Sequence, residues 1–280
     1  MPELAYLNGK IMPIDEAMVP IEDRGYQFGD AVYEYIASYK GRLFRTGMHL
    51  DRLEKSLGAL DFPPVSRSEM RRDILRLFES AQMPRAAIYI QISRGVASRN
   101  HAFSRSLDVQ MVMTIKPIPD THDYVDHGAK AITMQDFRWG RCDIKTVQLL
   151  PNVLAKQKAL DNGAYDAIFV APDGVVREAT SSNLFIVSNG IAVTHPLTLN
   201  ILPGITRAVM LEICQDRDIS VEERTFDTEE LFAADEVFLT GSTTEVLPIV
   251  EIDDRLIADG TVGTWTGTLY RELRLRAEGN

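Results

Sequence analysis

Polar and apolar residues alternate along the first part of the chain, and tight turns interrupt the alternation at two places. The stretch LAYLNGKIMPI sets Asn8 and Gly9 between two apolar runs. The stretch DAVYEYIASYKGRLFRT alternates aromatic and β-branched residues on either side of Lys40 and Gly41. Alternation of this period around such a pair predicts a β-hairpin in both places.

Two helical patterns follow these hairpins. In HLDRLEKSLGAL, leucines 50, 53, 57 and 60 recur at the spacing of one helix face, which predicts a helix. SRSEMRRDILRLFESA predicts a second helix, and its opening serines suit an N-terminal cap. The next two stretches, AAIYIQISRG and LDVQMVMTI, predict strands.

The pattern changes at KPIPDTHDYVDHG, where two prolines and several turn formers interrupt it. We therefore expect an N-terminal α+β domain over 1–117, a linker over 118–127 and a C-terminal domain over 128–280. In the third part, strands are predicted by AITM, DAIFVA, LFIVS, IAVTH and EVFLTG. Helical spacing recurs near 152–162, 205–217 and 264–277. The fold class is thus α+β or α/β, in two domains.

Composition narrows the classes of function. The chain has 280 residues, 40 of them acidic and 30 basic, which gives a net charge of −10. A net negative chain without a dense basic block is a poor partner for nucleic acid or an anionic membrane. The two cysteines and five histidines lack metal-ligand spacing and predict neither disulfides nor a metal site. The N-terminus has no basic start followed by a long apolar run, so we expect no signal peptide and a cytoplasmic protein.

RCDIKTVQLL, residues 141 to 150, places Lys145 in an alternating apolar run that predicts a strand. A lone lysine in such a strand is usually a solvated charge on its outer face. The other interpretation is an amine placed in a site because chemistry needs it there. Cys142, three residues earlier, is interpreted as a small buried filler.

Three other segments carry polar groups suited to a charged ligand. GVVREATSSNLFIV sets Glu178 just before a Thr-Ser-Ser-Asn run and a strand. LPGITRAVMLEI places Gly204 and Thr206 at the start of a helix, where free N–H groups and the helix dipole favour an anion such as phosphate. FLTGSTTEV ends a strand in a turn, residues 241–244, that can donate hydrogen bonds to the same anion.

A lysine amine, a carboxylate and two phosphate-binding turns are the parts that pyridoxal phosphate (PLP) requires. Its aldehyde forms a Schiff base with an amine, and its ring nitrogen needs a partner that sets its protonation. Taken singly, each part has a simpler interpretation. Glu178 would be a surface residue and PGIT a helix cap. The RNH run at 99–101 would be a solvated loop, Tyr33 a core aromatic, and Arg138 and Trp139 packing or supporting groups.

The chain resembles the fold-type IV PLP-dependent transaminases in seven stretches that occur in order: EDRGYQFGDAVYE, HLDRL, RGVASRNHAF, RWGRCDIKTVQLLPNVLAKQ, REATSSNLF, ILPGITR and EVFLTGSTTEV. That family includes D-amino-acid, branched-chain and (R)-amine transaminases and aminodeoxychorismate lyase. The resemblance covers nearly the whole chain and is closest to the D-amino-acid transaminases. It implies a smaller N-terminal α+β domain and a larger, strand-rich C-terminal domain built as a pseudo-barrel.

The resemblance also implies roles for individual residues. Lys145 matches the lysine that binds PLP as a Schiff base and then moves the substrate proton. Glu178 matches the partner of the pyridine nitrogen, and Arg52 matches the arginine that pairs with the phosphate. The two phosphate-binding turns are matched by Ile205, Thr206, Gly241 and Ser242. Substrate-binding groups are matched by Tyr33 and Thr243.

Arg99 and His101, in SRNHAF, match the Arg-x-His pair with which D-amino-acid transaminases bind the α-carboxylate. In those enzymes the loop reaches in from the neighbouring subunit, so the resemblance implies a homodimer with the active site at or near the subunit interface. A cationic pair suits carboxylate-bearing substrates rather than simple amines. The chain departs from the D-specific pattern at Tyr35 and Ala37, where well-known D-specific members have Val and Lys. It departs also at Gly241, where they often have Ser.

We therefore expect a PLP-dependent transaminase that exchanges the amino group between a D-amino acid and a 2-oxo acid. The resemblance implies ping-pong kinetics via pyridoxamine phosphate, with small amino and oxo acids as the partners. Three alternatives stay open. They are a branched-chain L-amino-acid transaminase, a PLP lyase of the aminodeoxychorismate type, and a non-catalytic binding protein of this fold.

Overall fold

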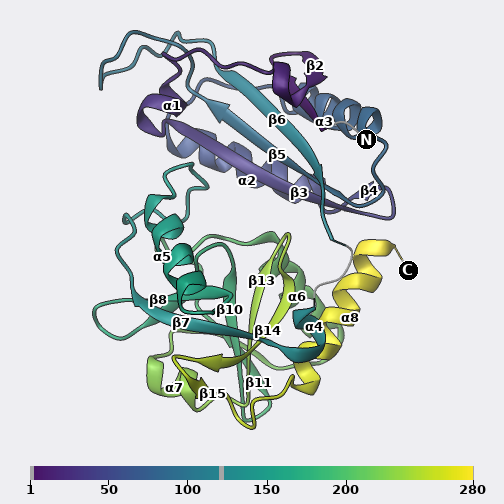
Figure 1. Cartoon of the computed structure of the whole chain (residues 1–280), viewed down its shortest axis with the longest axis vertical. Helices are drawn as coiled ribbons and strands as arrows, with labels where there is room; N and C mark the ends of the chain where they lie inside the picture. The colour runs from purple at the N-terminus through teal and green to yellow at the C-terminus, as the bar shows by residue number, and fades with distance from the viewer. Residues whose placement is uncertain (1–2, 120–122, 280) are drawn as a thin grey trace. The chain divides into compact units, whose positions relative to one another are not determined.

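The computed structural model describes residues 3–119 and 123–279, and the chain divides into two compact units, each with its own sheet (Figure 1). The first unit contains Met1–Asp120 and Ile144–Gln148, and the second contains Thr121–Asp143 and Leu149–Asn280. The predicted linker, 118–127, includes residues 120–122, which lie outside the described residues. Its later part contains the short helix α4 (Tyr124–His127).

The first unit is built on a six-stranded antiparallel sheet in the order β2-β1-β6-β5-β3-β4. Its strands are β1 (Leu4–Leu7), β2 (Lys10–Pro13), β3 (Ala31–Tyr39), β4 (Arg42–Leu43), β5 (Ala86–Ser93) and β6 (Gln110–Pro117). Both predicted hairpins are confirmed. Their turn residues have positive φ, with values of 45° and 96° at Asn8 and Gly9 and of 46° and 75° at Lys40 and Gly41.

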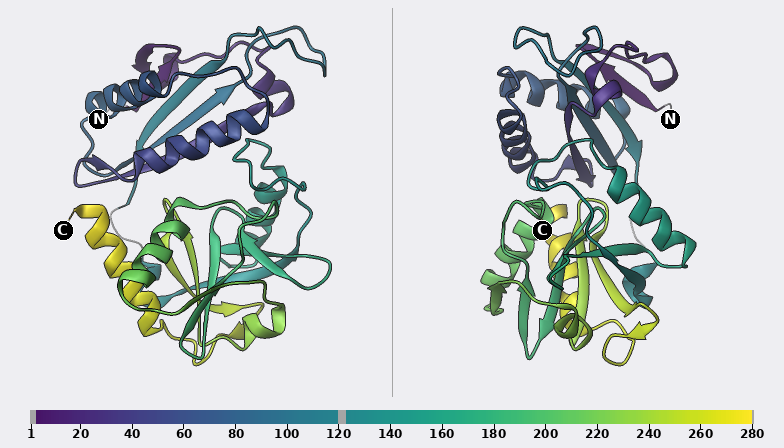
Figure 2. Two further views of the ribbon diagram at one scale, coloured as in Figure 1. Left: turned by 180° about the vertical axis from the view of Figure 1, so that it is seen from behind. Right: turned by 90° about the vertical axis from the view of Figure 1, so that its left-hand side faces the viewer.

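Helices α2 (Thr46–Ala59) and α3 (Arg67–Ala81) pack on one face of the sheet (Figure 2). Leu53 and Leu77 from these helices are buried against Ile88 of the sheet in one apolar core. The predicted serine cap is confirmed, because the hydroxyl of Ser66 accepts a hydrogen bond from the N–H of Glu69. The shorter elements are η1 (Ile14–Glu16) and α1 (Arg24–Phe28).

The second unit contains a closed sheet, which confirms the predicted pseudo-barrel. Each strand pairs with the next in the spatial order β10-β13-β14-β7-β8-β9. The sheet closes because β9 also pairs with β10, through Glu178 and Asn183. Strands β11 and β12 extend it beyond β10, and β15 pairs with β14. The bounds are β7 (Ala129–Gln135), β8 (Asp166–Val170), β9 (Val176–Ala179), β10 (Asn183–Ser188), β11 (Ile191–Thr194), β12 (Val221–Glu223), β13 (Glu236–Gly241), β14 (Glu245–Ile252) and β15 (Arg255–Leu256).

Helices surround this barrel at the three places that the sequence predicts. Helix α8 packs along β14, and α6 packs against α8 and β13. The helices are α5 (Leu150–Asp161), α6 (Ile205–Asp216), α7 (Thr228–Phe232) and α8 (Thr264–Glu278). Over residues 3–119 and 123–279, no helix is both long and apolar enough to cross a membrane.

The predicted strand over RCDIKTVQLL is wrong. The segment runs through turns, and only Thr146 forms an isolated bridge, with Val32 of β3. Its side chains do alternate in burial, but its backbone hydrogen bonds form no ladder. The N–H of Tyr33 donates to the carbonyl of Lys145 at 2.9 Å, and the N–H of Lys145 donates to the hydroxyl of Ser56 at 3.2 Å. These bonds explain why 144–148 groups with the first unit although it follows part of the second.

Candidate active site

The residues predicted to form the site belong to both units. Those in the first unit are Tyr33, Arg52, Arg99, His101 and Lys145. Those in the second unit are Glu178, Ile205, Thr206, Gly241, Ser242 and Thr243.

Lys145 is half-buried, and its ammonium group lies 4.2 Å from the centre of the Tyr33 ring. An ammonium over an aromatic face is held there by the ring quadrupole without a counter-charge. Among the side chains of residues 3–119 and 123–279, no carboxylate forms an ion pair with it. The amine is therefore oriented but open to reaction. Its half-buried position lies between that of a solvated surface lysine and that of a fully buried one.

Cys142 is buried, and burial raises the pKa of its thiol to about 11. A thiol with a pKa this high is neutral and a poor nucleophile near neutral pH. The structure thus supports the interpretation of Cys142 as a packing residue rather than a reactive group.

Arg52 lies on α2 and is fixed by a buried carboxylate, Glu34 of β3. The Arg52 Nε donates to one carboxylate oxygen at 2.7 Å and its Nη2 to the other at 2.8 Å, while His49 Nδ1 lies 2.7 Å from the second oxygen. Burial acts to raise the pKa of Glu34, but Arg52 and His49 outweigh it and lower that pKa to about 2. Glu34 therefore stays charged and sets the plane of the Arg52 guanidinium.

Sequence reasoning missed Glu34, although a signal for it exists. Val32 and Ile36, two residues away on each side, are fully buried, so alternation places Glu34 on the apolar face of β3. A carboxylate at such a position needs a buried cation as partner. Arg52 can be that cation, because the helical spacing of HLDRL places it next to the apolar face of its helix.

Replacing Glu34 with glutamine is expected to make the free energy of unfolding depend less on pH in the acid range. A pKa lowered from 4.5 to about 2 contributes stability that is present above pH 4.5 and is lost as the pH falls through about 2. The contribution is about 3 kcal/mol at neutral pH. Urea unfolding at pH 7, 4 and 3 should show a gap in unfolding free energy between wild type and variant that narrows with acidity. A gap of constant size would show that folding does not lower the pKa of Glu34.

The structure brings Arg99 and His101 together around one aromatic ring. Both lie on the exposed loop between β5 and β6. The Arg99 guanidinium stacks 4.6 Å from the centre of the Phe28 ring, and the His101 ring meets Phe28 edge-on at 5.6 Å. Two cationic or polar groups are thereby collected at one place, as carboxylate binding requires.

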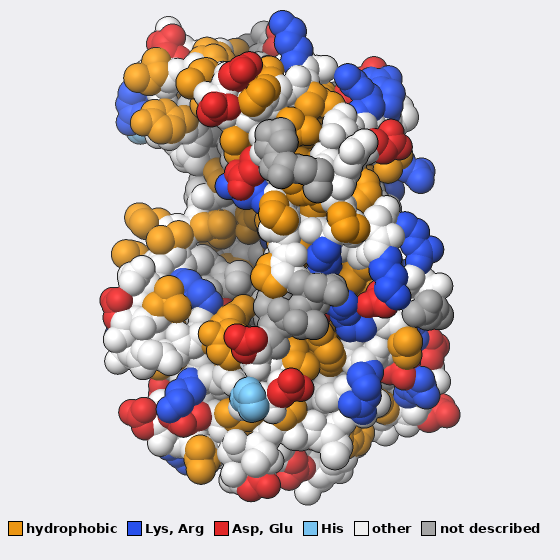
Figure 3. Space-filling view, turned by 45° about the vertical axis from the view of Figure 1, so that its right-hand side comes forward, with side chains coloured by type: hydrophobic (Ala, Val, Ile, Leu, Met, Phe, Trp, Pro, Cys, Tyr) orange, Lys and Arg blue, Asp and Glu red, His pale blue; other side chains and the backbone are white. Residues whose placement is uncertain are grey.

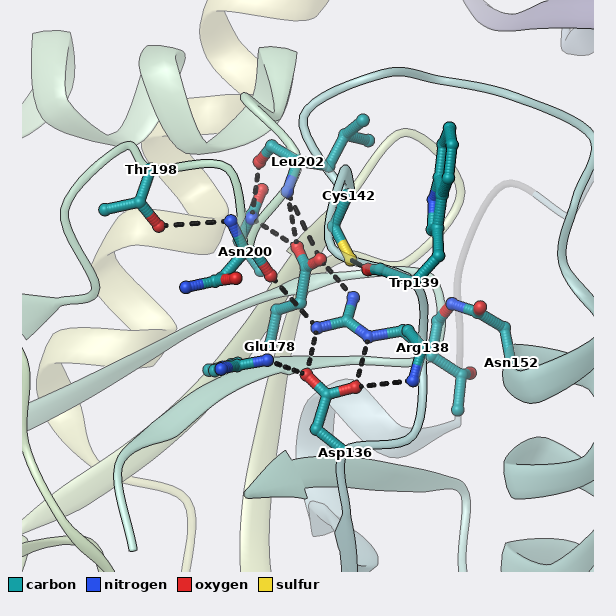
Figure 4. Close-up of polar contacts among 12 residues, drawn as sticks. Asp136, Arg138, Trp139, Cys142, Asn152, Glu178, Thr198, Asn200 and Leu202 are labelled. Atoms are coloured by element: carbon teal, nitrogen blue, oxygen red, sulfur yellow. Dashed lines mark hydrogen bonds and ion pairs between the residues drawn. The ribbon is translucent and has the colours of Figure 1, made fainter. Parts of the chain in front are cut away.

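Glu178, at the end of β9, is 5% exposed and lies inside a ring of donors (Figure 4). Arg138 Nη1 donates to one carboxylate oxygen at 2.5 Å. Asn183 Nδ2 and the N–H of Leu202 each donate to the other oxygen at 3.0 Å. Burial raises the pKa of Glu178, whereas Arg138 and the Leu202 N–H act to lower it.

Arg138 links Glu178 to a second buried carboxylate, Asp136 (Figure 4). Its Nε and Nη2 donate to the two Asp136 oxygens at 3.0 and 2.9 Å, and its Nη2 also donates to the carbonyl of Asn200 at 3.1 Å. Arg177 Nη1 donates to Asp136 at 2.7 Å. The sequence suggested only packing or support for Arg138, and the structure shows that it fixes the orientation of the Glu178 carboxylate.

Asn183 joins Glu178 to the start of α6. Besides its bond to Glu178, its Nδ2 donates to the carbonyl of Leu202 at 2.8 Å. A Cβ on Gly204, the residue that caps α6, would lie 2.0 Å from Asn183 Oδ1. Asn183 also pairs with Thr240 in the β10–β13 register, one residue before the turn at 241–244. Glu178 and the two predicted phosphate turns thus converge at one end of the barrel.

The two turns present donors of the kind that anions bind. Helix α6 begins at Ile205 and Thr206 without a side-chain cap, so the N–H groups of its first turn are available together with the helix dipole. In the other turn, Ser182 Oγ contacts Thr244 Oγ1 at 3.2 Å, and a Cβ on Gly241 would lie 3.1 Å from that Ser182 oxygen. Ser242 in this turn is half-buried and Thr243 is exposed.

Comparison with known proteins identifies the family of the chain. The family model of amino-transferase class IV matches residues 31–252. The chain belongs to the class IV aminotransferases. It is 40% identical over 268 residues to a D-alanine aminotransferase of Bacillus licheniformis, which covers 95% of this chain and 94% of the relative. It is 40% identical over 266 residues to that of Staphylococcus haemolyticus, which covers 94% of each chain.

Solved structures of this aminotransferase family share the whole fold. The branched-chain aminotransferase of Thermoproteus uzoniensis, solved with norvaline, has a TM-score of 0.89 at 26% identity, over 99% of this chain and 95% of that one. A second branched-chain amino acid aminotransferase, from T.th. and solved with pyridoxamine 5′-phosphate, has a TM-score of 0.92 at 25% identity, over 100% and 95%. The predicted membership of the fold-type IV family is confirmed.

The residues of this class IV aminotransferase fit PLP, the cofactor of the family. The amine of Lys145 suits an aldehyde, and the carboxylate of Glu178 suits a protonated ring nitrogen. The α6 N-terminus suits a phosphate, and Gly204 there has no room for a side chain because Asn183 fills it. The roles of the individual residues stay predictions.

Replacing Gly204 with alanine is expected to weaken PLP binding about tenfold or more. The φ of Gly204 is −66°, which any residue adopts, so the glycine is needed for space rather than conformation. The added methyl group would displace Asn183 from Glu178, and hydrogen bonds to charged groups contribute about 1.5–3 kcal/mol. Titration of the apoenzyme with PLP measures the effect.

Gly58→Ala is the matched control for this variant. Gly58 lies in α2, and a Cβ there would have no neighbour within 4 Å. We expect it to stabilise the helix by about 0.5–1 kcal/mol and to leave PLP affinity unchanged. Equal PLP affinities in the two variants would contradict the packing role of Gly204.

Proposed function

We propose that this class IV aminotransferase exchanges the amino group between a D-amino acid and a 2-oxo acid, with PLP as its cofactor. The observation that carries the proposal is the Arg99 and His101 pair collected around Phe28, which suits a substrate carboxylate. Relatives named D-alanine aminotransferase, at 40% identity over nearly the whole chain, support it.

Lys145 would hold the cofactor through its Nζ and then act as the general base and acid. Bound PLP supplies a cationic ring that withdraws electrons from the substrate carbon. The Lys145 amine takes the proton from the substrate α-carbon and returns a proton at the end of the transfer. Its Nζ lies 4.2 Å from the centre of the Tyr33 ring and has no carboxylate partner among the described residues, so no ion pair has to break before the amine reacts.

Glu178 would hold the proton on the ring nitrogen. Its own oxygens already accept hydrogen bonds from Arg138, Asn183 and Leu202, so its position stays fixed as charge develops on the ring.

Phosphate binding is assigned to Arg52, Ile205, Thr206, Gly241 and Ser242. Substrate binding is assigned to Tyr33, Arg99, His101 and Thr243.

A side-by-side assay of four donors tests the proposal. Purified enzyme is given D-alanine, L-alanine, D-glutamate or L-leucine, each with and without a 2-oxo acid acceptor. We expect turnover with the D-donors only, and only when the acceptor is present. Reaction with L-leucine alone among the four would overturn the proposed stereopreference and the carboxylate role of Arg99 and His101.

A branched-chain L-amino-acid transaminase is the second candidate. The solved structures with similar folds include branched-chain enzymes, and Gly241 departs from the serine that the D-specific pattern often has. Tyr35 and Ala37 lie on the same face of β3 as Tyr33, by strand alternation, and differ from the D-specific pattern. The L-leucine arm of the assay decides between the two. Pyruvate release without an acceptor would instead indicate a lyase.

We also propose a homodimer with the active site at or near the subunit interface. Large apolar side chains are exposed on each unit: Met18, Ile21 and Tyr26 are 73%, 77% and 74% exposed, and Leu150 and Val153 are 68% and 59% exposed. Figure 3 shows such hydrophobic side chains on the surface of both units. Apolar side chains in this number suit burial against a second copy.

A cytoplasmic location is proposed as well, because both cysteines are free thiols.

A further inference from the structure

The backbone of the loop that carries Arg99 and His101 is gripped by a buried arginine from another element. Arg24 of α1 is 3% exposed, and its Nη1 donates to the carbonyl of Asn100 at 2.6 Å. Its Nη2 donates to the carbonyl of His101 at 3.2 Å. One guanidinium thus holds two successive peptide groups, next to the very residues assigned to the substrate.

Arg24 is itself held rigidly. Its Nε donates to Asp30 at 2.9 Å, and Arg94 Nε donates to the same carboxylate at 2.8 Å. Arg94 is anchored in turn by the carbonyl of Leu60, to which its Nη2 donates at 2.6 Å. Hydrogen bonds between ionised groups in a buried setting are short and strong. Arg24 is therefore held in place while it donates to the loop carbonyls.

Phe28, at the other end of α1, holds the side chains of the same loop. Its ring lies 4.8 Å from the Arg24 guanidinium and 4.6 Å from that of Arg99, and it meets the His101 ring edge-on. Phe28 is half-buried and does not belong to the apolar core of its unit. The ring contacts that the structure describes for Phe28 are therefore with Arg24 and this loop.

We infer that Arg24 and Phe28 are positioning residues that hold Arg99 and His101 ready to bind the substrate carboxylate. The inference rests on the proposed function of that pair. An arginine side chain has large rotamer freedom, and a free loop would have to order it at each binding event. Arg24 removes the freedom of the loop backbone and Phe28 removes that of the two side chains before the substrate arrives.

The effect should appear in KM rather than in kcat. Phe28→Leu keeps an apolar side chain but removes the ring, so we expect KM for D-alanine to rise about tenfold while kcat changes less than about twofold. Phe28→Tyr restores the ring and should return KM to near the wild-type value. Arg24→Lys keeps a charge for Asp30 but loses the two-carbonyl grip, and it should raise KM likewise.

A matched control is Phe44→Leu. Phe44 is a half-buried ring of the same unit that also lies near an arginine, Arg45 at 5.7 Å, but it is remote in sequence from the loop and belongs to the β3–β4 hairpin end. It should leave KM unchanged. The visible absorbance of bound PLP should be the same in all these variants, which shows that the cofactor site is intact.

Trypsin cleavage after Arg99 measures the loop directly, without catalysis. The peptide bond after Arg99 should be cut several times faster in Phe28→Leu and Arg24→Lys than in wild type or Phe44→Leu, because cleavage requires the loop to open. Unchanged cleavage and unchanged KM in both positioning variants would overturn the inference.

Arg99→Gln separates this inference from the proposed function. If Arg99→Gln raises KM for D-alanine but Phe28→Leu and Arg24→Lys do not, the positioning inference fails and the carboxylate role stands. If Arg99→Gln itself leaves KM unchanged, the proposed carboxylate role fails, and the inference that rests on it fails too.

Discussion

Lys145→Ala is expected to lower kcat/KM for amino transfer by at least about 10³-fold, because the variant loses both the cofactor attachment and the proton-moving group. PLP should still bind through the phosphate and ring contacts, but dialysis should remove it. The visible absorbance of the enzyme should shift to that of free, unattached PLP. Steady-state kinetics and absorbance spectra before and after dialysis check the prediction.

Lys158→Ala is the control for this variant. Lys158 lies on the exposed side of α5. It should retain wild-type kinetics and spectrum. Residual activity in Lys145→Ala above about a tenth of wild type would show that another amine does the chemistry.

Glu178→Gln is expected to lower kcat about 10²- to 10³-fold with a much smaller effect on PLP affinity. Glutamine keeps the shape of the side chain but has no charge with which to hold a proton on the ring nitrogen. The fold should survive, because Asp136 still pairs with Arg138 through two hydrogen bonds at 3.0 and 2.9 Å. Single-turnover kinetics and a thermal melt measure the two effects separately.

Glu229→Gln, on the exposed side of α7, is the matched control and should behave as wild type. If Glu178→Gln transfers amino groups at the wild-type rate, the ring nitrogen must have another partner. If it unfolds instead, Glu178 serves chiefly as the counter-charge of Arg138, and Asp136 is an insufficient partner by itself.

Local signals in the sequence were sufficient for most of the fold. The positive φ at Gly9 and Gly41 follows from pairs that favour tight turns, and the Ser66 cap follows from its place before an apolar helix. The strand predicted around Lys145 failed because burial alternates there without a hydrogen-bonded ladder. Periodicity reports which side chains are buried, and it does not report where the backbone bonds go.

The sequence suggests packing or support for Arg138, but the partners of the supporting residues could not be predicted, because each partner lies far along the chain. Arg24 grips the carbonyl of Asn100, and Arg138 holds Glu178. The spacing of residues near Arg24 or near Arg138 gives no sign of either contact. Gly204 illustrates the difference: the sequence marks it as a helix start, and only the structure shows that Asn183 fills the space of its missing side chain.

Chemical trapping identifies the lysine that carries PLP. Reduction of the enzyme with sodium borohydride makes the lysine–PLP bond permanent, and tryptic peptides are then analysed by mass spectrometry. We predict one modified peptide, which begins at Cys142, contains Lys145 and resists cleavage after it. Modification of Lys156 or Lys158 in place of Lys145, or of no lysine at all, would contradict the assignment of Lys145 as the lysine that binds PLP.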